Sequence, residues 1–400
     1  YHQLGHLSHL TRLMNILVVH NKYYYRGGED TVVDAEASLL RRSGHKVLIY
    51  SRDNKEIDKI STLRLALDTF GSTRTMDDIQ RIHQEFKPDI IHAHNIFPLI
   101  SPSIYKVAKK FYIPIVQTLH NFRLMCPQAM LFRDGKACES CIGNIPWRAS
   151  LYHCYRNSFA QSSFTALAIT THKIIYNWEQ SFHHYIVLSQ IARDKFIQGG
   201  ISEKQLSIKP NFVESKRVPN WSQRERGIFI GRLSVEKGLD VLVKAVALLD
   251  KIKIDVYGTG PLEALVSAAS GLTSLGFHPQ SALINRLHQV AYLVMPSTGI
   301  ESFGLVAIEA FSCGTPVIAS RHGSLAEIIE HGKTGLLVKP GDHQELAHAI
   351  AWAESHPDAM KIMGEAAYNE YLERYTPESN YKILMEIYDK TIAQFQTFNQ

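Results

Sequence analysis

Residues 291–320 read AYLVMPSTGIESFGLVAIEAFSCGTPVIAS. The stretch begins with an apolar run, Ala291–Pro296, and ends with a second one, Pro316–Ser320. Between the two lie a loop that contains Gly304 and a helical pattern. Two apolar runs joined by a helix are typical of parallel strands with a crossover helix. The stretch therefore predicts one strand–helix–strand unit of a parallel sheet.

The same alternation runs through the rest of the chain. In the first half, the apolar runs that precede helical patterns are Ile16–His20, Val47–Tyr50, Asp89–His94, Ile115–His120 and Ile186–Ser189. In the second half they are Gly227–Gly231, Ile254–Gly258 and Thr273–Phe277, followed by the two runs named above. A chain of 400 residues suits two domains of ordinary size. We therefore expect the α/β class, with two doubly wound, Rossmann-like domains.

Pro210 and Asn211 separate the two halves, because these residue types interrupt regular structure just before a new apolar run begins. We place one domain at 14–210 and the other at 211–377, and we treat residues 1–13 as a leader or a cloning remnant ahead of Met14. Ligands of open parallel sheets bind beyond the carboxyl ends of the strands. Two such sheets that face one another would enclose a central cleft, where we expect the active site.

Charge and hydropathy exclude several classes of protein. The net charge of +5 is modest for this length and is not gathered into one run, which argues against nucleic-acid binding. No run approaches the ~20 apolar residues of a membrane-spanning helix, and the N-terminus lacks a signal pattern, so we expect a cytoplasmic protein. Lys106, Lys109 and Lys110 could attract an anionic membrane surface, although a solvated helix face is the favoured interpretation.

The most specific motif lies in the stretch from Glu301 to Glu309. The loop Ser302–Leu305 opens a helix, whose first N–H groups are unpaired and suit a phosphate or a developing negative charge. Glu301 and Glu309 are about two helical turns apart, and carboxylates accept hydrogen bonds from sugar hydroxyls. Taken alone, Glu301 could equally cap the helix and Glu309 could pair with a surface base.

A second motif, GRLSVEKG at residues 231–238, follows a predicted strand directly. Arg232 offers a planar fork of donors and Lys237 a point charge, and together they can neutralise a diphosphate leaving group. The alternative is an ordinary surface ion pair on a strand-to-helix loop.

Two weaker motifs follow strands of the first half. Gly27 and Gly28 let the backbone approach a ligand closely at a helix N-terminus, but they form neither a dinucleotide-binding fingerprint nor a P-loop. His120 closes another strand, where a histidine can bind a sugar hydroxyl or carry a proton. Many strand-end histidines simply bond a backbone carbonyl instead.

Together these motifs resemble glycosyltransferase family four, a group of retaining enzymes with the two-domain GT-B fold. The resemblance extends from Met14 to about Tyr388. It rests on the Gly27-Gly28 loop, Gly44–Val47, Pro88–His94, His120, Pro210-Asn211, Gly231-Arg232 with Lys237-Gly238, and Glu301 with Glu309. The family implies that residues 14–210, with about 378–400 returning to them, face the acceptor, and that 211–377 bind a nucleotide-sugar donor.

The resemblance also implies roles for individual residues. Glu309 would hold the ribose hydroxyls, and Glu301 with the backbone of Ser302, Phe303, Gly304 and Leu305 would hold the transferred sugar. Arg232 and Lys237 would bind the diphosphate, which Gly27 and Gly28 would meet from the other domain. His120 would contact the sugar or the acceptor, and the segment from Phe277 and His278 to Pro279 would hold the base.

The implied activity is transfer of a hexose, with retention of configuration, from a nucleotide diphosphate sugar. UDP-glucose is the first candidate for the donor, and a glycan or lipid-linked precursor of a bacterial polysaccharide, at the inner face of the membrane, is the candidate acceptor. No Asp-x-Asp motif occurs near the donor loops, so we expect no catalytic metal. A GT-B nucleotide-sugar epimerase and a non-catalytic nucleotide-sugar binding protein are the alternatives.

Four of the five cysteines form a cluster in the sequence: Cys126, Cys138, Cys141 and Cys154. One C-x-x-C with two further cysteines could supply four thiolates to a structural zinc ion, which would stiffen a loop too small to own a core. The same residues are also consistent with reduced or partly oxidised thiols. Cys313 lies in an apolar run and is expected in the core.

Overall fold

The computed structural model describes residues 12–176, 184–222 and 224–398. Residues 1–11 of the expected leader lie outside this range. The chain divides into two compact units. Unit 1 holds the described residues 12–118 and 388–398 with His184, and unit 2 holds those from 119 to 387 without His184. The boundary at Pro210 and Asn211 stays a prediction.

Unit 1 contains the strands β1 (Asn15–Lys22), β2 (Lys46–Asp53) and β3 (Ile90–Ala93), and most of β4 (Ile115–Leu119). β1 pairs in parallel with β2 on one side and β3 on the other. Six consecutive residues of β1 are buried, as expected for a parallel strand covered on both faces. The helices of this unit are α1 (Gly28–Arg42), α2 (Thr62–Phe70), α3 (Thr73–Phe86) and α4 (Ser103–Lys110).

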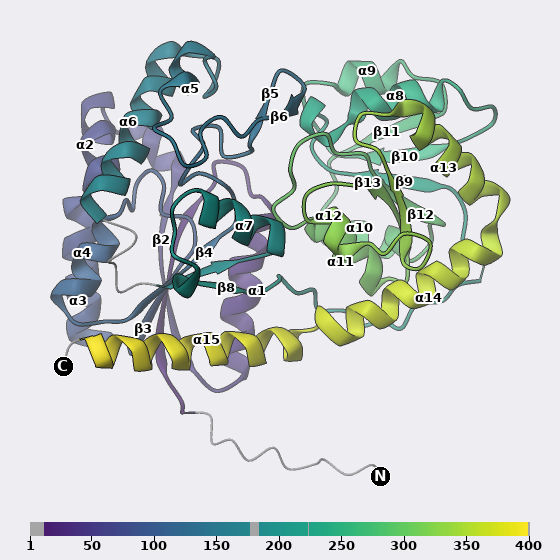
Figure 1. The fold of residues 1–400 in the computed structure, drawn as a ribbon. Helices are drawn as coiled ribbons and strands as arrows, with labels where there is room; N and C mark the ends of the chain where they lie inside the picture. The colour runs from purple at the N-terminus through teal and green to yellow at the C-terminus, as the bar shows by residue number, and fades with distance from the viewer. Residues whose placement is uncertain (1–11, 177–183, 223, 399–400) are drawn as a thin grey trace, which may run out of the picture. The chain divides into compact units, whose positions relative to one another are not determined.

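Unit 2 is built on a parallel sheet of six strands in the order β11-β10-β9-β12-β13-β14 (Figure 1). These strands are β9 (Gly227–Ile230), β10 (Ile254–Tyr257), β11 (Leu272–Gly276), β12 (Tyr292–Met295), β13 (Val317–Ser320) and β14 (Gly335–Val338). Successive residues of a strand point to opposite faces of a sheet, and two separate apolar cores result. Ile228 and Leu293 belong to one core, and their neighbours Phe229 and Val294 belong to the other.

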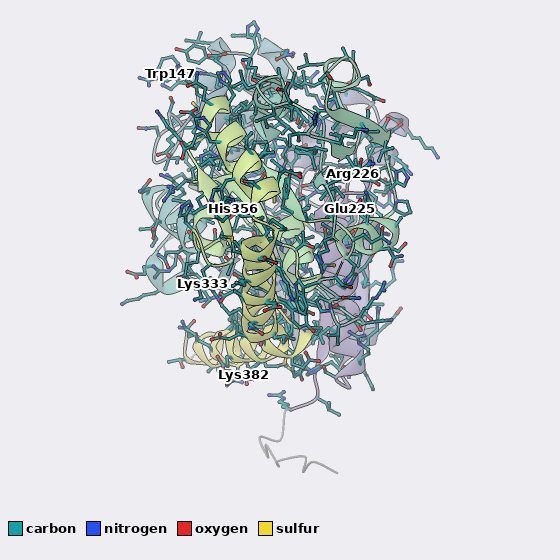
Figure 2. The ribbon with its side chains drawn as sticks, turned by 90° about the vertical axis from the view of Figure 1, so that its right-hand side faces the viewer. Trp147, Glu225, Arg226, Lys333, His356 and Lys382 are labelled. Atoms are coloured by element: carbon teal, nitrogen blue, oxygen red, sulfur yellow. The ribbon has the colours of Figure 1, made fainter. Side chains whose placement is uncertain are left out.

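Helices cover both cores of unit 2. Buried residues of α11 (Leu305–Ser312) and of the second half of α14 (Pro357–Arg374) lie in the first core. Buried residues of α8 (Leu239–Val246) and α13 (His343–Ser355) lie in the second. His356, labelled in Figure 2, lies where α13 ends and α14 begins.

The strands β7 (His184–Val187) and β8 (Leu206–Ile208) extend the first sheet, whose order is β2-β1-β3-β4-β7-β8. A short antiparallel hairpin, β5 (Phe132–Arg133) and β6 (Lys136–Ala137), stands apart. The remaining helices are α5 (Arg148–Leu151), α6 (Phe159–Tyr176), α7 (Gln190–Gln198), α9 (Glu263–Ser267), α10 (Gln280–Leu287), α12 (Leu325–Ile328) and α15 (Pro377–Phe398), with 3₁₀ turns η1 (Asn54–Lys59), η2 (Glu203–Gln205) and η3 (Val235–Lys237).

The predicted α/β class with two doubly wound parallel sheets is confirmed. Each run predicted as a strand overlaps a strand of the structure. The sequence analysis missed the last strand of each sheet, β8 and β14, although β14 is as long as several of the strands that it predicted. Among the described residues, no helix has both the length and the apolar composition needed to cross a membrane.

Within unit 1, a buried hydrogen bond joins the last part of α15 to β3. The Tyr388 hydroxyl lies 2.7 Å from His92 Nδ1, and both side chains are fully buried. His92 Nε2 lies 2.8 Å from the Thr118 hydroxyl. β3 therefore carries a polar side chain whose partners come from the C-terminal helix and from β4.

Candidate active site

In unit 2, the loop after β9 is hydrogen-bonded to the loop after β12. The Glu236 carbonyl accepts bonds from the N–H groups of Thr298, at 3.0 Å, and Gly299, at 2.9 Å. The Thr298 hydroxyl donates to the Val235 carbonyl at 2.9 Å. β9 and β12 are parallel neighbours, so their carboxyl ends meet at one edge of the sheet. The two motifs predicted to bind a donor are thereby brought together.

Gly238 makes this close approach possible. Its φ of 72° lies in the left-handed region, which glycine enters without steric cost. A Cβ atom at this position would lie 1.9 Å from the Pro296 carbonyl oxygen. Gly238 ends η3 and precedes α8, so the turn directs the preceding residue, Lys237, toward the loop after β12.

Lys237, Ser297 and Glu301 form a polar cluster at this edge. Lys237 Nζ donates to Glu301 Oε1 at 2.6 Å, and the Ser297 hydroxyl donates to the same oxygen at 2.8 Å. The Lys237 side chain is 32% exposed and the Glu301 side chain 15% exposed. The ion pair is therefore accessible to a ligand from the Lys237 side.

The environment of Glu301 favours its ionised form. Burial acts to raise the pKa of Glu301, but the Lys237 charge and the hydrogen bonds from Lys237 and Ser297 outweigh it and hold the pKa below its usual value. His322 lies beside the cluster, with Nε2 2.9 Å from the Ser297 carbonyl oxygen. Glu301 is a carboxylate that can accept further hydrogen bonds.

Arg232 lies two residues after the end of β9 and is exposed. Within the described part of the chain, its guanidinium takes part in no recorded ion pair. Lys237 lies five residues further along the same loop. The loop therefore presents two cations, one engaged with Glu301 and one directed to solvent, and both can bind an anion.

The loop before α11 is held in a conformation that exposes the helix N-terminus. Gly304 has a φ of 86° and caps α11, and a Cβ atom there would lie 2.8 Å from Leu325 Cδ2. Phe303 points inward, since it is 4% exposed and its ring packs edge-on against Tyr375. Only the backbone of Phe303 is thus available to a ligand.

Ser302 is anchored on both sides within unit 2. Its hydroxyl donates to the His120 carbonyl at 2.6 Å, and its carbonyl accepts from the Ser189 hydroxyl at 3.0 Å. His120, half-buried, is therefore a neighbour of the loop before α11. The structure brings together His120, Ser302 and, through the same loop, Glu301.

Glu309 lies deeper, in the second turn of α11. It is 5% exposed, and Gln280 Nε2 donates to its Oε1 at 2.5 Å. Burial raises the pKa of Glu309 to about 7, against the opposing effect of the Gln280 hydrogen bond. Its charge state therefore changes near neutral pH, and a ligand that donates hydrogen bonds to it would favour the carboxylate.

The segment expected to hold the base lies next to Gln280, the partner of Glu309. Phe277 is 75% exposed. His278 packs edge-on against the Tyr257 ring, with centroids 5.0 Å apart. Gln280 begins α10 three residues after Phe277. The structure thereby links the predicted base-binding segment to the predicted ribose-binding carboxylate through one side-chain hydrogen bond.

Gly27 and Gly28 lie at the N-terminus of α1, in unit 1. Asp30 accepts from the Gly27 N–H at 2.8 Å, and its other oxygen lies 2.9 Å from His20 Nε2. Burial acts to raise the pKa of Asp30, but the hydrogen bonds from His20 and Gly27 outweigh it and lower the pKa. The buried carboxylate of Asp30 thus fixes the backbone of the predicted phosphate-binding loop.

Cys126, Cys138, Cys141 and Cys154 all line one small cavity in unit 2, and none of them is in a disulfide. Burial, with the nearby charges of the other three thiolates, raises the pKa of Cys141 to about 12. Cys313 lies apart, fully buried in the core of unit 2 as predicted.

A second group of metal-binding residue types was not singled out from the sequence. Among the described residues, Glu36, His92 and His94 are the one group of three whose ligand atoms all lie within 4.8 Å of one another. All three are buried. His92 bonds Tyr388 and Thr118, and burial, followed by the neighbouring His92, lowers the pKa of His94 to about 3. These contacts describe a buried polar network that joins α1, β3, β4 and α15.

Ser297 and Gln280 are the residues of the candidate site that sequence reasoning missed. Each bonds one of the two predicted carboxylates, Glu301 and Glu309 respectively. Ser297 follows a predicted strand directly, and a polar residue at the carboxyl end of a strand in a parallel sheet can indicate a ligand site. Gln280 had no such signal, because its partner lies 29 residues away in sequence.

Comparison with known families assigns both halves of the chain. Residues 26–217 match the model described as Glycosyltransferase Family 4, and residues 213–370 match the model described as Glycosyl transferases group 1. The two matches overlap at residues 213–217 and together span most of the chain.

Individual relatives are more distant. Sulfoquinovosyl transferase of Arabidopsis thaliana is 27% identical over 325 residues, which are 76% of this chain and 56% of that protein. D-inositol 3-phosphate glycosyltransferase of Corynebacterium urealyticum is 35% identical over 182 residues, 40% of this chain and 42% of the relative. The chain thus spans about half the length of these two relatives. An uncharacterised protein in the cps region of Klebsiella pneumoniae is 25% identical over 79% of this chain and 87% of its own length.

Solved structures share the fold. Sucrose-phosphate synthase from Thermosynechococcus elongatus superposes with a TM-score of 0.71 at 21% identity, over 94% of this chain and 99% of that one. HepE of Anabaena, solved in complex with UDP and glucose, superposes with a TM-score of 0.65 at 18% identity, with the same coverage. With its two family matches and its two six-stranded parallel sheets, the chain belongs to glycosyltransferase family four and has the GT-B fold.

Proposed function

We propose that this protein is a retaining glycosyltransferase that moves a hexose from a UDP-sugar, with UDP-glucose as the first candidate, to a glycan or lipid-linked acceptor in bacterial polysaccharide synthesis. The observation that carries the proposal is the cluster of Lys237, Ser297 and Glu301 at the carboxyl edge of the second sheet. It places an accessible cation beside a carboxylate, next to the N-terminus of α11.

The cations of this edge suit the leaving diphosphate. Arg232 can bind two phosphate oxygens through its planar fork, and Lys237 adds a point charge. The first N–H groups of α11 add partial positive charge. Negative charge builds up on the diphosphate as the bond to the sugar breaks, so donors placed beforehand lower the barrier of that step.

The two carboxylates suit the hydroxyls of the donor. Glu309, buried beside Gln280 and the segment that follows β11, would accept hydrogen bonds from the ribose. Glu301, ionised and close to the loop before α11, would accept them from the transferred sugar. Their different depths match the two ends of a nucleotide sugar, with the diphosphate between them.

The relatives support the choice of donor and pathway. HepE of Anabaena has been solved with UDP-glucose, although at 18% identity the likeness extends to the fold alone. The Klebsiella pneumoniae relative is named for the cps region. We infer a nucleotide-sugar donor from the donor-side cluster, and we take UDP-hexose as the first donor to test and a polysaccharide precursor as the first acceptor.

In the proposed reaction, the bond between the anomeric carbon and the phosphate oxygen breaks, and the acceptor oxygen attacks from the same face. The departing phosphate oxygen takes the acceptor proton, so that UDP leaves and configuration is retained. This step needs no protein nucleophile, and we propose none. His120, half-buried beside Ser302, would contact the sugar or the acceptor.

Thermal stabilisation by UDP, UDP-glucose, GDP-mannose and ADP-glucose tests the donor, since a ligand at a hundred times its Kd adds about 2.7 kcal/mol of stability. Arg232→Ala and Glu309→Gln should lose the stabilisation. Arg81→Ala, a change at an exposed arginine of α3, should keep it. Stabilisation by none of the nucleotides, or an unchanged response in both donor-site variants, would refute the donor site.

Product analysis separates the proposal from its alternatives. Incubation with UDP-glucose should release UDP slowly even without an acceptor, as expected of a transferase that uses water inefficiently. A nucleotide-sugar epimerase would instead change the sugar while it remained attached to UDP, and a binding protein would give neither product. With an acceptor in hand, the anomeric coupling constant of the product tests retention.

The proposed acceptor side includes an apolar surface on α5, α6 and the segment before them. From Ile142 to Tyr176 the chain has no Asp or Glu but carries Arg148, Arg156 and Lys173. The large apolar side chains exposed in this segment are Ile145, Trp147, Leu151, Tyr152, Phe159, Leu167, Ile174 and Ile175. An anionic bilayer suits such a surface, because apolar side chains and cations both favour it.

The arrangement on α6 strengthens this assignment. Phe159, Leu167 and Ile174 recur at spacings of eight and seven residues, which places them on one face of the helix. A cavity of about 380 Å³ lies beside them, and Ile145 and Ile174 are among its lining residues. α4, with its three exposed lysines, buries its apolar residues instead. We therefore assign membrane contact to α5 and α6 rather than to α4.

Co-sedimentation with vesicles of phosphatidylglycerol and of phosphatidylcholine tests the surface. The protein should bind the anionic vesicles more tightly than the neutral ones. Leu167→Gln with Ile174→Gln should weaken binding about tenfold or more, because two apolar side chains that would be buried in the bilayer are lost. Ile362→Gln, at an equally exposed isoleucine of α14, serves as the control. Equal binding by all variants would refute the assignment, without bearing on the donor site.

A further inference from the structure

We propose that Cys126, Cys138, Cys141 and Cys154 bind one structural zinc ion, which fixes the segment between β4 and α6. The site is distinct from the residues assigned to the donor. It rests on three observations: the convergence of four thiols on one cavity, the size of that cavity, and the lack of a core in the segment that the thiols join.

The four thiols come from four separate turns. Cys126 follows the tight turn after Phe122, and Cys138 follows β6, with its N–H bonded to the Leu131 carbonyl. Cys141 lies in the next turn, and the Cys154 N–H bonds the Ala149 carbonyl just after α5. A hairpin that leads directly into C-x-x-C, with two further cysteines delivered from either side, matches the ligand supply of a structural zinc site.

The cavity that all four residues line has a volume of about 20 Å³. This is room for one water-sized occupant, which suits a single ion and is too small for an iron–sulfur cluster or an organic ligand. Among the described residues, no three of these sulfur atoms lie within 4.8 Å of one another. Bound zinc, with Zn–S distances of about 2.3 Å, would therefore draw the four turns inward around the cavity.

The part of this segment from Arg133 to Ser158 needs such a cross-link because it has almost no core of its own. Its buried residues are Pro146 and Ala149 alone, and its regular structure is confined to the short hairpin and one helical turn. Asp134, His153, Arg156 and Asn157 all have positive φ values, four of the eleven such non-glycine residues among those described. Backbone of this kind persists only where the surroundings hold it in place.

The charge around the cavity also fits. Four thiols that bind Zn²⁺ release four protons, and the resulting centre carries two negative charges. Arg133 and Arg148 line the cavity beside the cysteines. Two guanidinium groups at this position would offset the charge of the centre, in addition to the contacts that Arg133 makes with Tyr152 and Asp134.

Zinc would also position the proposed membrane surface. Cys141 and Cys154 flank Trp147, Leu151 and the whole of α5. A zinc ion held by both cysteines would fix the apolar side chains of α5 relative to those of α6. The effect of the metal can therefore be measured through membrane binding as well as through catalysis.

Metal analysis of the full chain, purified without chelator, is the first test. We expect about one zinc per chain in the parent protein and in Cys313→Ala, a change at the cysteine that lies outside the cluster. Cys141→Ser and Cys154→Ser should lose most of the zinc. Cobalt bound in its place should give the visible absorption of a tetrahedral thiolate site, which Cys141→Ser should lack.

If the serine variants fail to fold, chelation of the parent protein replaces them. Removal of the metal should lower the melting temperature, and zinc but not magnesium should restore it. UDP stabilisation should survive chelation, which separates failure of this proposal from failure of the donor site. Four titratable thiols, or disulfides among the four cysteines, in a folded parent protein without zinc would overturn the proposal, as would iron in place of zinc.

Discussion

Lys237 Nζ and Glu301 Oε1 lie 2.6 Å apart, although 64 residues separate them in sequence. The contact joins the loop after β9 to the loop after β12, and the backbone of Glu236 reinforces the junction with two further hydrogen bonds. Both side chains belong to the proposed donor site. One ion pair therefore serves the stability of unit 2 and the placement of its cation at the same time.

Lys237→Met should destabilise the protein by about 1–2 kcal/mol, because it leaves the largely buried Glu301 carboxylate without its ion-pair partner. The double variant Lys237→Met with Glu301→Gln should regain more than half of that loss, since no charge is then left unpaired. Urea unfolding measures both. Activity toward the donor should stay low in both variants, so recovery of stability without recovery of activity is the expected signature. Additive destabilisation in the double variant would contradict the pairing.

Glu309→Gln should raise stability at alkaline pH while it abolishes UDP binding. The folded-state pKa of Glu309, about 7, lies above the ordinary value of 4.5 for this side chain, so keeping the carboxylate ionised in the folded protein costs about 3 kcal/mol at pH 8.5. The cost begins as pH rises through the unfolded-state value and is complete above the folded-state value. The stabilisation by Gln should therefore shrink between pH 8.5 and pH 5.5. Melting temperatures at these two pH values measure it, and a constant difference would count against the buried carboxylate.

UDP affinity of the parent protein should fall as the pH falls through about 7, because the proposed contact with ribose hydroxyls needs the Glu309 carboxylate. Below that pH, the Kd should rise by up to tenfold per pH unit. Calorimetric titration between pH 5.5 and pH 8.5 measures the trend. A pH-independent Kd would argue that the nucleotide does not contact Glu309.

Gly238→Ala should destabilise the protein far more than Gly341→Ala. Both glycines have left-handed backbone, with φ values of 72° and 78°, and an alanine there costs about 1–2 kcal/mol. At Gly341 nothing lies within 4 Å of the added Cβ, whereas at Gly238 the Cβ would lie 1.9 Å from the Pro296 carbonyl oxygen. We expect the additional clash to displace η3 and to remove UDP stabilisation. Equal melting temperatures for the two variants would show that the close approach is relieved without cost.

Tyr388→Phe should lower the free energy of unfolding by about 1 kcal/mol, because it removes the buried hydroxyl that lies 2.7 Å from His92 Nδ1 and leaves that nitrogen with Glu36 Oε1, 3.0 Å away, as its partner. Tyr112→Phe is the control, since Tyr112 is 71% exposed and should change stability little. Denaturant unfolding of unit 1, followed by a probe placed in that unit, gives the comparison. Similar losses in the two variants would mean that the His92 network does not depend on the end of α15.

The sequence by itself determined the α/β architecture and the positions at which chemistry could be placed. Alternating apolar runs and helical patterns are local features, and each predicted run became a strand. At or after the ends of those runs lie the predicted site residues Arg232, Lys237, Glu301 and His120. The spacing of the four cysteines likewise indicated one site, and the structure places them around one cavity.

Tertiary contacts determine which of these residues lie together and which other side chains bond them. Ser297 bonds Glu301 and Gln280 bonds Glu309, and these pairs form only through the packing of separate loops. Phe303 turned out to face the core, and only its backbone is left for a ligand. The physical reason is that strand and helix patterns depend on neighbours along the chain, whereas these contacts depend on the closure of distant loops. That closure rests on single backbone features, such as the left-handed turn at Gly238, whose partner Pro296 is 58 residues away along the chain.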